Sequence, residues 1–126
     1  IASKNIVVLG AGRLVGRPVS LWLTKNQAVY TMIGKETPDM EAHFKTADIV
    51  ISGVGKPGLI ISSMLKKGVI LIDAGTAESH GKVVGDVDPI GIENVASLYT
   101  PVPGGVGPLT VAMVFRNLVA LAEQKK

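Results

Sequence analysis

The chain has 126 residues, which is enough for one domain with a hydrophobic core of its own. Hydrophobic residues make up 47% and charged residues only 18%, so we expect another domain or a second subunit to cover part of the surface. A membrane span is not expected, because no apolar run reaches about 18 residues, and neither is a nucleic-acid surface, because the net charge of +3 is scattered and aromatic residues are few.

A strand predicted over residues 5–10 is followed by a glycine turn and by a helix predicted over residues 14–25. This order is typical of a nucleotide-binding βαβ unit. Gly10 permits the tight turn, Gly12 permits a phosphate to approach the backbone, and the start of the helix offers free N–H groups to an anion. The third glycine, Gly16, falls one residue later than in the usual dinucleotide fingerprint, so a glycine-rich loop without a ligand is the alternative.

Strands and helices continue to alternate along the rest of the chain. We predict strands over residues 27–33, 48–52, 69–72 and 97–100, helices over residues 39–46, 62–67 and 108–123, a polar loop over 79–82, and either a short extended piece or a turn over 83–89. This alternation predicts an α/β fold, in which a single domain holds a doubly wound parallel sheet flanked by helices. The last helix is apolar over a broad arc, which predicts burial on more than one side; its main stripe is Val111, Val114, Phe115, Leu118 and Leu121.

Loops at the carboxyl ends of the strands are the expected ligand-binding positions, because ligands of open α/β sheets bind at that edge. After the second strand, Lys35 could bind a 2′-phosphate and Glu36 could bind ribose hydroxyls, with a solvated turn as the alternative. After the third strand, residues 53–58 form a second glycine-rich loop, with a plain tight turn as the alternative. Residues 73–76 close the fourth strand in the same way.

The remaining polar residues indicate no further chemistry. His43 and His80 have no partner at metal-ligand spacing and the chain contains no cysteine, so neither a metal site nor a disulfide is expected. We expect Asp73, Asp86 and Asp88 to form capping and turn hydrogen bonds. The absence of cysteine also fits a reducing, cytoplasmic compartment.

The segment over residues 100–113 reads Thr-Pro-Val-Pro-Gly-Gly-Val-Gly-Pro-Leu-Thr-Val-Ala-Met. It resembles the hallmark of the bifunctional methylenetetrahydrofolate dehydrogenase/methenyltetrahydrofolate cyclohydrolase family. Further stretches agree with this family in order and spacing, over residues 15–18, 47–50, 55–57 and 85–88. The resemblance runs from about residue 4 to residue 122, which is nearly the whole chain.

The resemblance implies that residues 1–126 are a Rossmann-like NAD(P)-binding domain and that the family's N-terminal catalytic and folate-binding domain is absent from this chain. That domain carries a Tyr-x-x-x-Lys motif, but Gly34 stands four residues after Tyr30 and Pro103 four residues after Tyr99. No catalytic residue is therefore expected here. The implied partners are the dinucleotide, a reduced folate held through the other domain, and a second copy in a full-length homodimer. A chain that begins with Ile rather than Met also fits a processed or excised piece.

NADP is the cofactor that the resemblance favours, and NAD is the alternative. The family has Gly-Arg-Ser where this chain has residues 10–12, so Arg13 and Lys35 remain as candidates to bind a 2′-phosphate, which Glu36 would repel if it pointed inward. Arg17 adds a further positive charge beside the turn. The implied cofactor-binding residues are Gly10, Ala11, Gly12, Arg13, Leu14, Val15, Gly16, Lys35, Gly53, Val54, Gly55, Gly75, Thr76 and Thr110.

The implied reaction is hydride transfer from the methylene carbon of a reduced folate to nicotinamide, after which water opens the methenyl ring. This chain would position the nicotinamide beside the loop over residues 101–110. Two alternatives stay open. One is a stand-alone NAD(P)-binding module that senses the cofactor or regulates a partner, and the other is a different Rossmann enzyme such as a methyltransferase.

Overall fold

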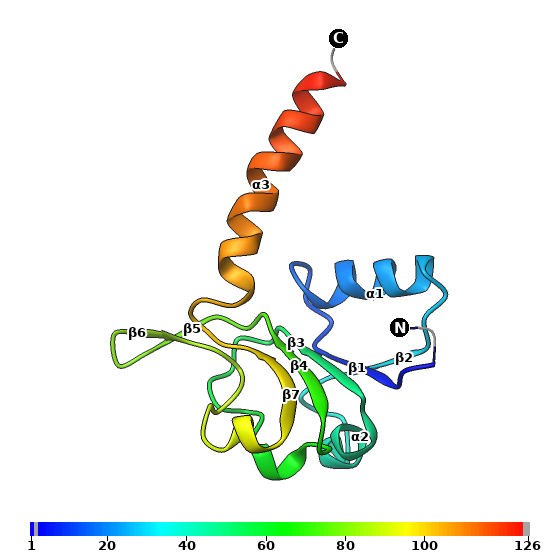
Figure 1. The fold of residues 1–126 in the computed structure, drawn as a ribbon, viewed down its shortest axis with the longest axis vertical. Coiled ribbons are helices and arrows are strands. Elements are labelled where there is room, and N and C mark those ends of the chain that lie inside the picture. The colour runs from blue at the N-terminus through cyan, green and yellow to red at the C-terminus, as the bar shows by residue number, and fades with distance from the viewer. Residues whose placement is uncertain (2, 125–126) are drawn as a thin grey trace.

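The computed structural model describes residue 1 and residues 3–124. Five parallel strands form one sheet in the order β2-β1-β3-β4-β7, and helices α1 and α2 cover opposite faces of it (Figure 1). The prediction of a single α/β domain with a doubly wound parallel sheet is confirmed. The elements are β1 (Ile6–Leu9), α1 (Gly16–Lys25), β2 (Tyr30–Ile33), α2 (Met40–Thr46), β3 (Ile49–Ser52), β4 (Val69–Asp73), β5 (Ala77–Ser79), β6 (Lys82–Val84), β7 (Ala96–Thr100) and α3 (Val106–Glu123).

The central strands are apolar on both sides because both faces of the sheet are covered. All four residues of β1 are buried, and Val7 of this strand pairs in register with Val50 of β3. Continuous runs of β-branched residues are typical of parallel strands in this position. The strand order reverses between β1 and β3, since the chain first adds β2 on one side of β1 and then β3 on the other.

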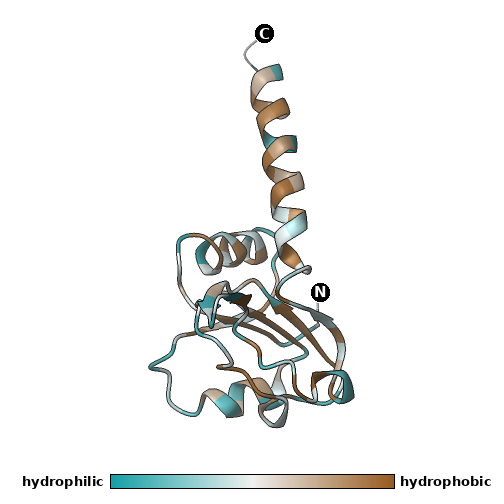
Figure 2. Cartoon of the chain, turned by 90° about the vertical axis from the view of Figure 1, so that its left-hand side faces the viewer, coloured by the Kyte–Doolittle hydropathy of each residue, from teal (hydrophilic) through white to brown (hydrophobic). Residues whose placement is uncertain are grey.

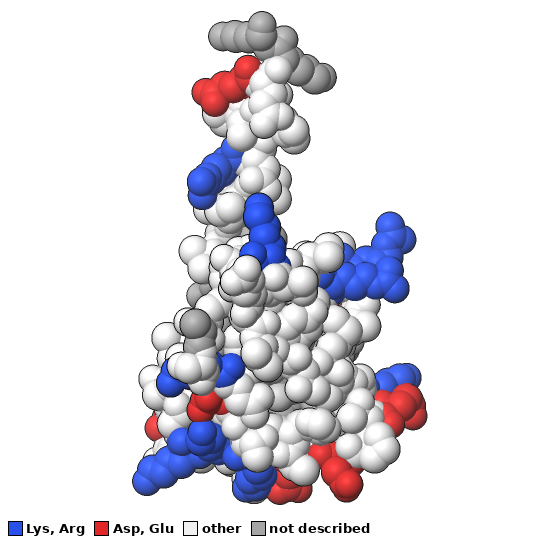
Figure 3. Space-filling model, turned by 90° about the vertical axis from the view of Figure 1, so that its right-hand side faces the viewer, with Lys and Arg blue, Asp and Glu red and all other residues white. Residues whose placement is uncertain are grey.

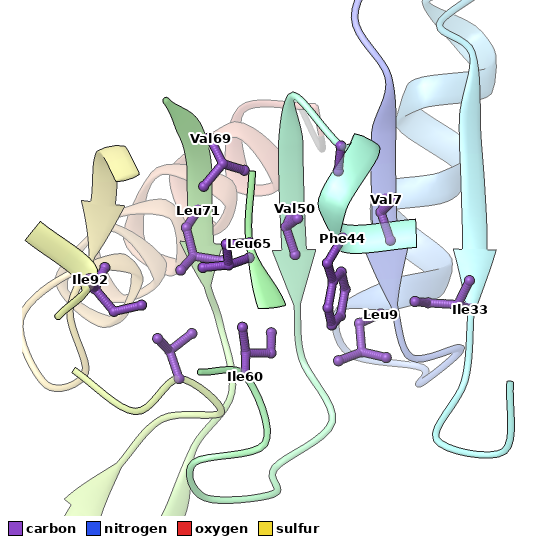
Figure 4. Packing of buried hydrophobic residues seen from close by; sticks show 12 residues of the cluster. Val7, Leu9, Ile33, Phe44, Val50, Ile60, Leu65, Val69, Leu71 and Ile92 are labelled. Carbon is purple, nitrogen blue, oxygen red and sulfur yellow. The ribbon is translucent and has the colours of Figure 1, made fainter. Parts of the chain in front are cut away.

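Helix α2 closes one face of the sheet through a single aromatic side chain. Phe44 is fully buried, and Figure 4 shows it beside Leu9 at the end of β1. The partly buried Met40, one helical turn earlier, packs against the same cluster, because residues four apart lie on one face of a helix. Ile60 and Leu65, from the connection between β3 and β4, complete this side of the core.

Helix α1 closes only part of the other face. Leu23 of α1 packs with Ile6, Val8 and Ile49, which are buried on β1 and β3. Toward β7 this face is open, and Leu98, which pairs with Ile70, is 50% exposed.

Several predicted boundaries move for local backbone reasons. Residues 27–33 do not all form a strand, because Gln27 adopts a left-handed φ of 54° as the chain leaves α1, and β2 begins only at Tyr30. The predicted helix over residues 62–67 is a single 3-10 turn, Ser62–Met64, because Leu65 is already extended.

The polar loop predicted over residues 79–82 is the turn of an antiparallel hairpin formed by β5 and β6. His80 and Gly81 occupy its tip with φ angles of 52° and 73°. Two successive left-handed residues are the signature of a two-residue hairpin turn. The hairpin stands outside the main sheet (Figure 1).

Helix α3 projects away from the sheet, and none of its residues is buried (Figure 1). It begins at Val106, two residues before the predicted start, because Pro108 falls in the first turn, where an N–H group has no intrahelical partner. Hydrophobic segments recur along the whole length of the helix, with a few hydrophilic ones between them (Figure 2). The prediction that α3 is buried on more than one side is therefore wrong for this chain by itself, and its exposed large side chains are Leu109, Val111, Met113, Val114, Phe115, Leu118, Val119 and Leu121.

By length and composition alone, α3 also meets the criterion for a membrane-spanning helix, contrary to the expectation that no segment would do so. Core helices of soluble proteins meet the same criterion. Arg116 and Glu123 are its charged residues, and charged side chains in Figure 3 concentrate on the body of the domain rather than on this helix.

An ion pair joins the amino ends of three strands. The Asp48 carboxylate, just before β3, accepts hydrogen bonds from the Lys66 ammonium group at 2.6 Å and from the Asn5 backbone N–H group at 2.9 Å. The hydrogen bond from Lys66 is the main cause of a lowered pKa at Asp48, and the hydrogen bond from Asn5 adds to it.

We predict that Asp48→Asn lowers the thermal unfolding temperature at pH 7 and that the difference from the wild type disappears once the pH has fallen below the lowered pKa of the Asp48 carboxyl group. Because the folded-state pKa is lowered, the stabilisation is present above the ordinary carboxyl pKa and is lost as the pH falls through the lowered value. Calorimetric melting curves across this pH range test it, with Lys67→Met as a control at a neighbouring lysine. A difference that stays constant with pH would contradict the prediction.

Candidate functional site

The carboxyl ends of the parallel strands bring five loops to one edge of the sheet, as predicted. These loops follow β1 at residues 10–15, β2 at 34–36, β3 at 53–58, β4 at 74–76 and β7 at 101–105. Hydrogen bonds hold neighbouring loops in place: the Gly10 N–H group donates to the Ile33 carbonyl oxygen at 2.8 Å, and the Ala74 N–H group donates to the Ser52 carbonyl oxygen at 2.8 Å.

The turn after β1 is compact because its glycines lack side chains. Gly10 has a left-handed φ of 99°, which favours glycine. A Cβ atom on Gly16 would overlap the Gly10 carbonyl oxygen, so this glycine lets α1 begin directly against the turn. Gly12 differs, because a Cβ atom there would meet only the Gly53 carbonyl oxygen, at 3.9 Å.

Helix α1 begins beside this turn without a side chain that caps it. Val15 occupies the N-cap position, and no acidic residue lies in the first turn. Arg13, which precedes the helix, and Arg17, in its first turn, are both exposed. The partial positive charge of a helix N-terminus and two nearby guanidinium groups make this end of α1 suitable for an anion.

The loop after β3 fills the space between the first turn and the loop after β4. A Cβ atom on Gly53 would lie 2.5 Å from the Val15 Cβ atom, so Gly53 permits the two loops to touch. Val54 approaches Gly10, and Gly55 lies close to the Thr76 carbonyl oxygen. The predicted residues of the three loops are thus brought together at the switch point of the sheet.

Other predicted residues stand apart from this group. Ala11 and Leu14 are exposed on the first turn, and Leu14 is 93% exposed. Lys35 is also exposed, with its ammonium group 3.8 Å from the Glu36 carboxylate. Thr110 lies on α3, where its hydroxyl donates to the Val106 carbonyl oxygen. Within the described part of the chain, no hydrogen bond connects Lys35 or Thr110 to the glycine loops.

Two carboxylates behind the loops are fully buried. Among the described residues, the donors to the Asp73 and Asp86 carboxylates are backbone N–H groups and the Ser52 hydroxyl. Burial raises the pKa of Asp73; the backbone donors oppose this effect, and the carboxylate of Asp86 adds to it. The expectation of capping and turn hydrogen bonds is confirmed for Asp73, which accepts from the Gly75 N–H group, and for Asp88, which accepts from the Ile90 N–H group. The hydrogen bonds of Asp86 instead reach across the fold.

Sequence reasoning missed this long-range role. The available signal was a pair of acidic residues in otherwise apolar surroundings, next to Gly75 and Gly85, which leave room for them.

Together the loops offer backbone donors and positive charge to an anion. Among the residues that the structure describes, no cluster of metal-ligating side chains is present.

The comparisons with known proteins agree with this architecture. A family model described as "Tetrahydrofolate dehydrogenase/cyclohydrolase, NAD(P)-binding domain" matches residues 1–126. The "Bifunctional protein FolD" of Staphylococcus aureus strain Newman is 43% identical over 127 residues, which is 100% of this chain and 44% of that protein. The protein of the same name from Staphylococcus epidermidis is 46% identical over 125 residues, covering 98% of this chain and 43% of that protein.

Solved structures give the same result. The bifunctional FolD methylenetetrahydrofolate dehydrogenase/cyclohydrolase of Campylobacter jejuni superposes with a TM-score of 0.93 at 38% identity, over 99% of this chain and 45% of that one. The Trypanosoma brucei enzyme, solved with NADP cofactor and an inhibitor, gives a TM-score of 0.91 at 36% identity, over 99% of this chain and 45% of that one. This chain, which spans about 44% of the length of its curated relatives, therefore belongs to the NAD(P)-binding domain family of tetrahydrofolate dehydrogenase/cyclohydrolases.

Proposed function

We propose that this chain binds NADP at the carboxyl edge of the sheet and positions its nicotinamide for reaction with a reduced folate. The observation that carries the proposal is the open space at Gly12, beside the uncapped start of α1. Nothing in the fold requires glycine there, since its φ is not left-handed and a Cβ atom would meet no close neighbour. A small residue at this position, glycine here and serine in the family that the sequence resembles, leaves the backbone open to the approach of a ligand phosphate.

The three adjoining loops supply the contacts in this proposal. Backbone N–H groups of residues 10–16 hold the diphosphate, with Arg13 adding positive charge. The adenosine lies toward β2 and Lys35, and the nicotinamide lies toward β3 and β4, as in other doubly wound sheets. The nicotinamide side is formed by Gly53, Val54, Gly55, Gly75, Thr76 and Thr110, and the turn side also includes Ala11, Leu14 and Val15.

When bound, the nicotinamide ring supplies the acceptor for a hydride from 5,10-methylenetetrahydrofolate. The residues of this chain orient and hold the dinucleotide. We assign no role as a catalytic acid, base or nucleophile to them. We propose that the catalytic and folate-binding groups lie in the part of such an enzyme that these 126 residues do not include, and that the opening of the methenyl ring also takes place there. In this proposal the loop over residues 101–105, which joins β7 to α3, faces the folate-binding part of the enzyme.

We propose that α3 packs against this folate-binding part of the enzyme. Its apolar stripe is exposed in the chain alone, as it would be if its packing partner lay elsewhere. Trp22 on α1 and Leu98 on β7 are also exposed apolar side chains, at 56% and 50%, and they support a homodimer of the full-length enzyme. The cysteine-free sequence supports a cytoplasmic location.

Replacement of Gly12 by valine is expected to abolish NADP binding without loss of stability. The new side chain has room in the free protein but occupies the space assigned to the diphosphate. We expect the affinity for NADP to fall by about 100-fold or more, which is roughly two tenfold steps in the dissociation constant. Isothermal titration calorimetry measures the affinity, and thermal melting shows that the fold is kept.

S-adenosylmethionine is the matched ligand control for this titration. A wild-type chain that is folded and binds neither NADP nor NAD contradicts the proposal. A Gly12→Val variant with wild-type affinity contradicts the placement of the diphosphate. Binding of S-adenosylmethionine instead would favour a different Rossmann enzyme.

Lys35 and Glu36 are expected to tune the choice between NADP and NAD in opposite directions. Lys35→Ala should weaken NADP about tenfold and leave NAD within about twofold, because only NADP carries a 2′-phosphate for the ammonium group to bind. Glu36→Gln should strengthen NADP, because a like charge is removed. Parallel titrations with both dinucleotides measure this, and equal losses for the two after Lys35→Ala would remove Lys35 as the discriminating residue.

Paired substitution of Phe115 and Leu118 by serine is expected to leave the unfolding temperature of the 126-residue chain unchanged. Both side chains are exposed in the chain, at 64% and 63%, so no packing is lost. The same change in a full-length enzyme should lower its unfolding temperature by several degrees, because the stripe then loses buried contacts. Differential scanning calorimetry of both proteins tests this, with Asn117→Ser on the same helix as the control. An unchanged full-length enzyme would mean that α3 is not covered there.

A further inference from the structure

Asp86 lies behind the loops that the proposed function assigns to the nicotinamide, and its side chain accepts hydrogen bonds from the end of β3 and the loop that follows it. One carboxylate oxygen accepts a hydrogen bond from the Ser52 hydroxyl at 2.6 Å and another from the Val54 N–H group at 2.8 Å. The other oxygen accepts from the Lys56 N–H group at 2.7 Å. Three donors, one from the last residue of β3 and two from the loop that follows it, thus converge on one carboxylate that is separated from them by at least 30 residues in sequence.

The backbone of Asp86 is itself held by a second carboxylate. One oxygen of Asp73, at the end of β4, accepts from the Gly75 N–H group at 2.9 Å and from the Asp86 N–H group at 3.2 Å. Its other oxygen accepts from the Val87 N–H group at 3.0 Å. The loop after β3, the loop after β4 and the segment over residues 85–87 are therefore joined through two side chains.

Neighbouring residues leave room for this pair. A Cβ atom on Gly75 would overlap the Asp86 carboxylate, and a Cβ atom on Gly85 would overlap the Asp73 carboxylate. Such an atom on Gly85 would also lie 2.8 Å from a methyl group of Val102, so the same segment contacts the loop after β7. Both aspartates are 0% exposed, and within the described residues neither forms an ion pair with a lysine or arginine.

A buried carboxylate without a cation is costly unless every hydrogen bond to it is kept. Hydrogen bonds to an ionised acceptor are also stronger than neutral ones. The arrangement therefore fixes the shape of the 53–56 loop more tightly than a turn held by backbone bonds alone. This loop lies between the first glycine turn and Thr76, where the nicotinamide half of the dinucleotide is assigned.

We propose that Asp86 is a positioning residue for the nicotinamide half of the bound dinucleotide, and that it acts by holding the 53–56 loop through Ser52, Val54 and Lys56. This inference rests on the proposed function, because it assumes that the dinucleotide lies at this edge. Asp86 itself lies behind the loop and touches backbone and hydroxyl groups, so it does not contact the reacting atoms. Substitution of Asp86 is therefore expected to weaken binding of the nicotinamide half of the ligand more than binding of the adenosine half.

The test compares NADP with adenosine 2′,5′-bisphosphate, which is the adenosine half of NADP and lies toward β2. Asp86→Asn replaces one acceptor oxygen by an amide that cannot accept the hydrogen bonds. We expect the affinity for NADP to fall about tenfold and the affinity for adenosine 2′,5′-bisphosphate to change by less than about twofold. Titration calorimetry of the 126-residue chain gives both values, and Asp88→Asn, two residues along the same segment, is the matched control.

Ser52→Ala supplies a second, milder variant. It removes one of the three donors and leaves the carboxylate with two backbone hydrogen bonds, so we expect NADP to weaken about threefold and the adenosine half to be unaffected. If Asp86→Asn does not fold, the NADP affinity of Ser52→Ala tests the positioning role. Unchanged NADP affinity, or equal losses for both ligands, overturns the positioning role. A folded wild type that binds no NADP instead overturns the proposed function and this inference with it.

Discussion

Close contact between backbone segments at the carboxyl edge of the sheet is the constraint on which the candidate site depends. Parallel pairing brings the ends of β1, β3 and β4 to the same edge, but side chains on the following loops would hold those loops apart. Glycine at positions 16, 53, 75 and 85 removes atoms that would overlap a neighbouring carbonyl or side chain. The site is therefore made largely of main chain, whose N–H groups can bind a ligand without side-chain specificity.

The glycines of this edge fall into two physical classes. Gly16 and Gly53 are required by the fold, since a Cβ atom on either would meet protein atoms within 2.5 Å. Gly12 is required by nothing in the protein and faces open space at the start of α1. This difference distinguishes glycines that the packing of the turn requires from a glycine that leaves space for a ligand. The spacing of the glycines in the sequence does not make that distinction. The longer spacing to Gly16 also has a local explanation, because that residue packs on Gly10.

The sequence predicted those features of the fold that depend on local composition. The apolar runs of β1 and β3, from which strands were predicted, reflect their burial on both faces of the sheet. Boundaries were harder, because they depend on single backbone conformations such as the left-handed Gln27. The hairpin of β5 and β6 was missed for a similar reason: its strands have three residues each and little apolar alternation.

Long-range polar contacts could not be read from local pattern in the same way. Asp86 looks like an ordinary turn residue in the sequence, yet its partners lie in a loop about 30 residues earlier. The reverse holds for α3, whose apolar pattern predicted burial that the chain alone does not provide. Both cases follow from one principle: the polarity of a residue reflects its surroundings in the complete assembly and not in the neighbouring sequence alone. For Asp86 that environment lies within these residues, whereas for α3 the proposed packing against a folate-binding domain would supply it.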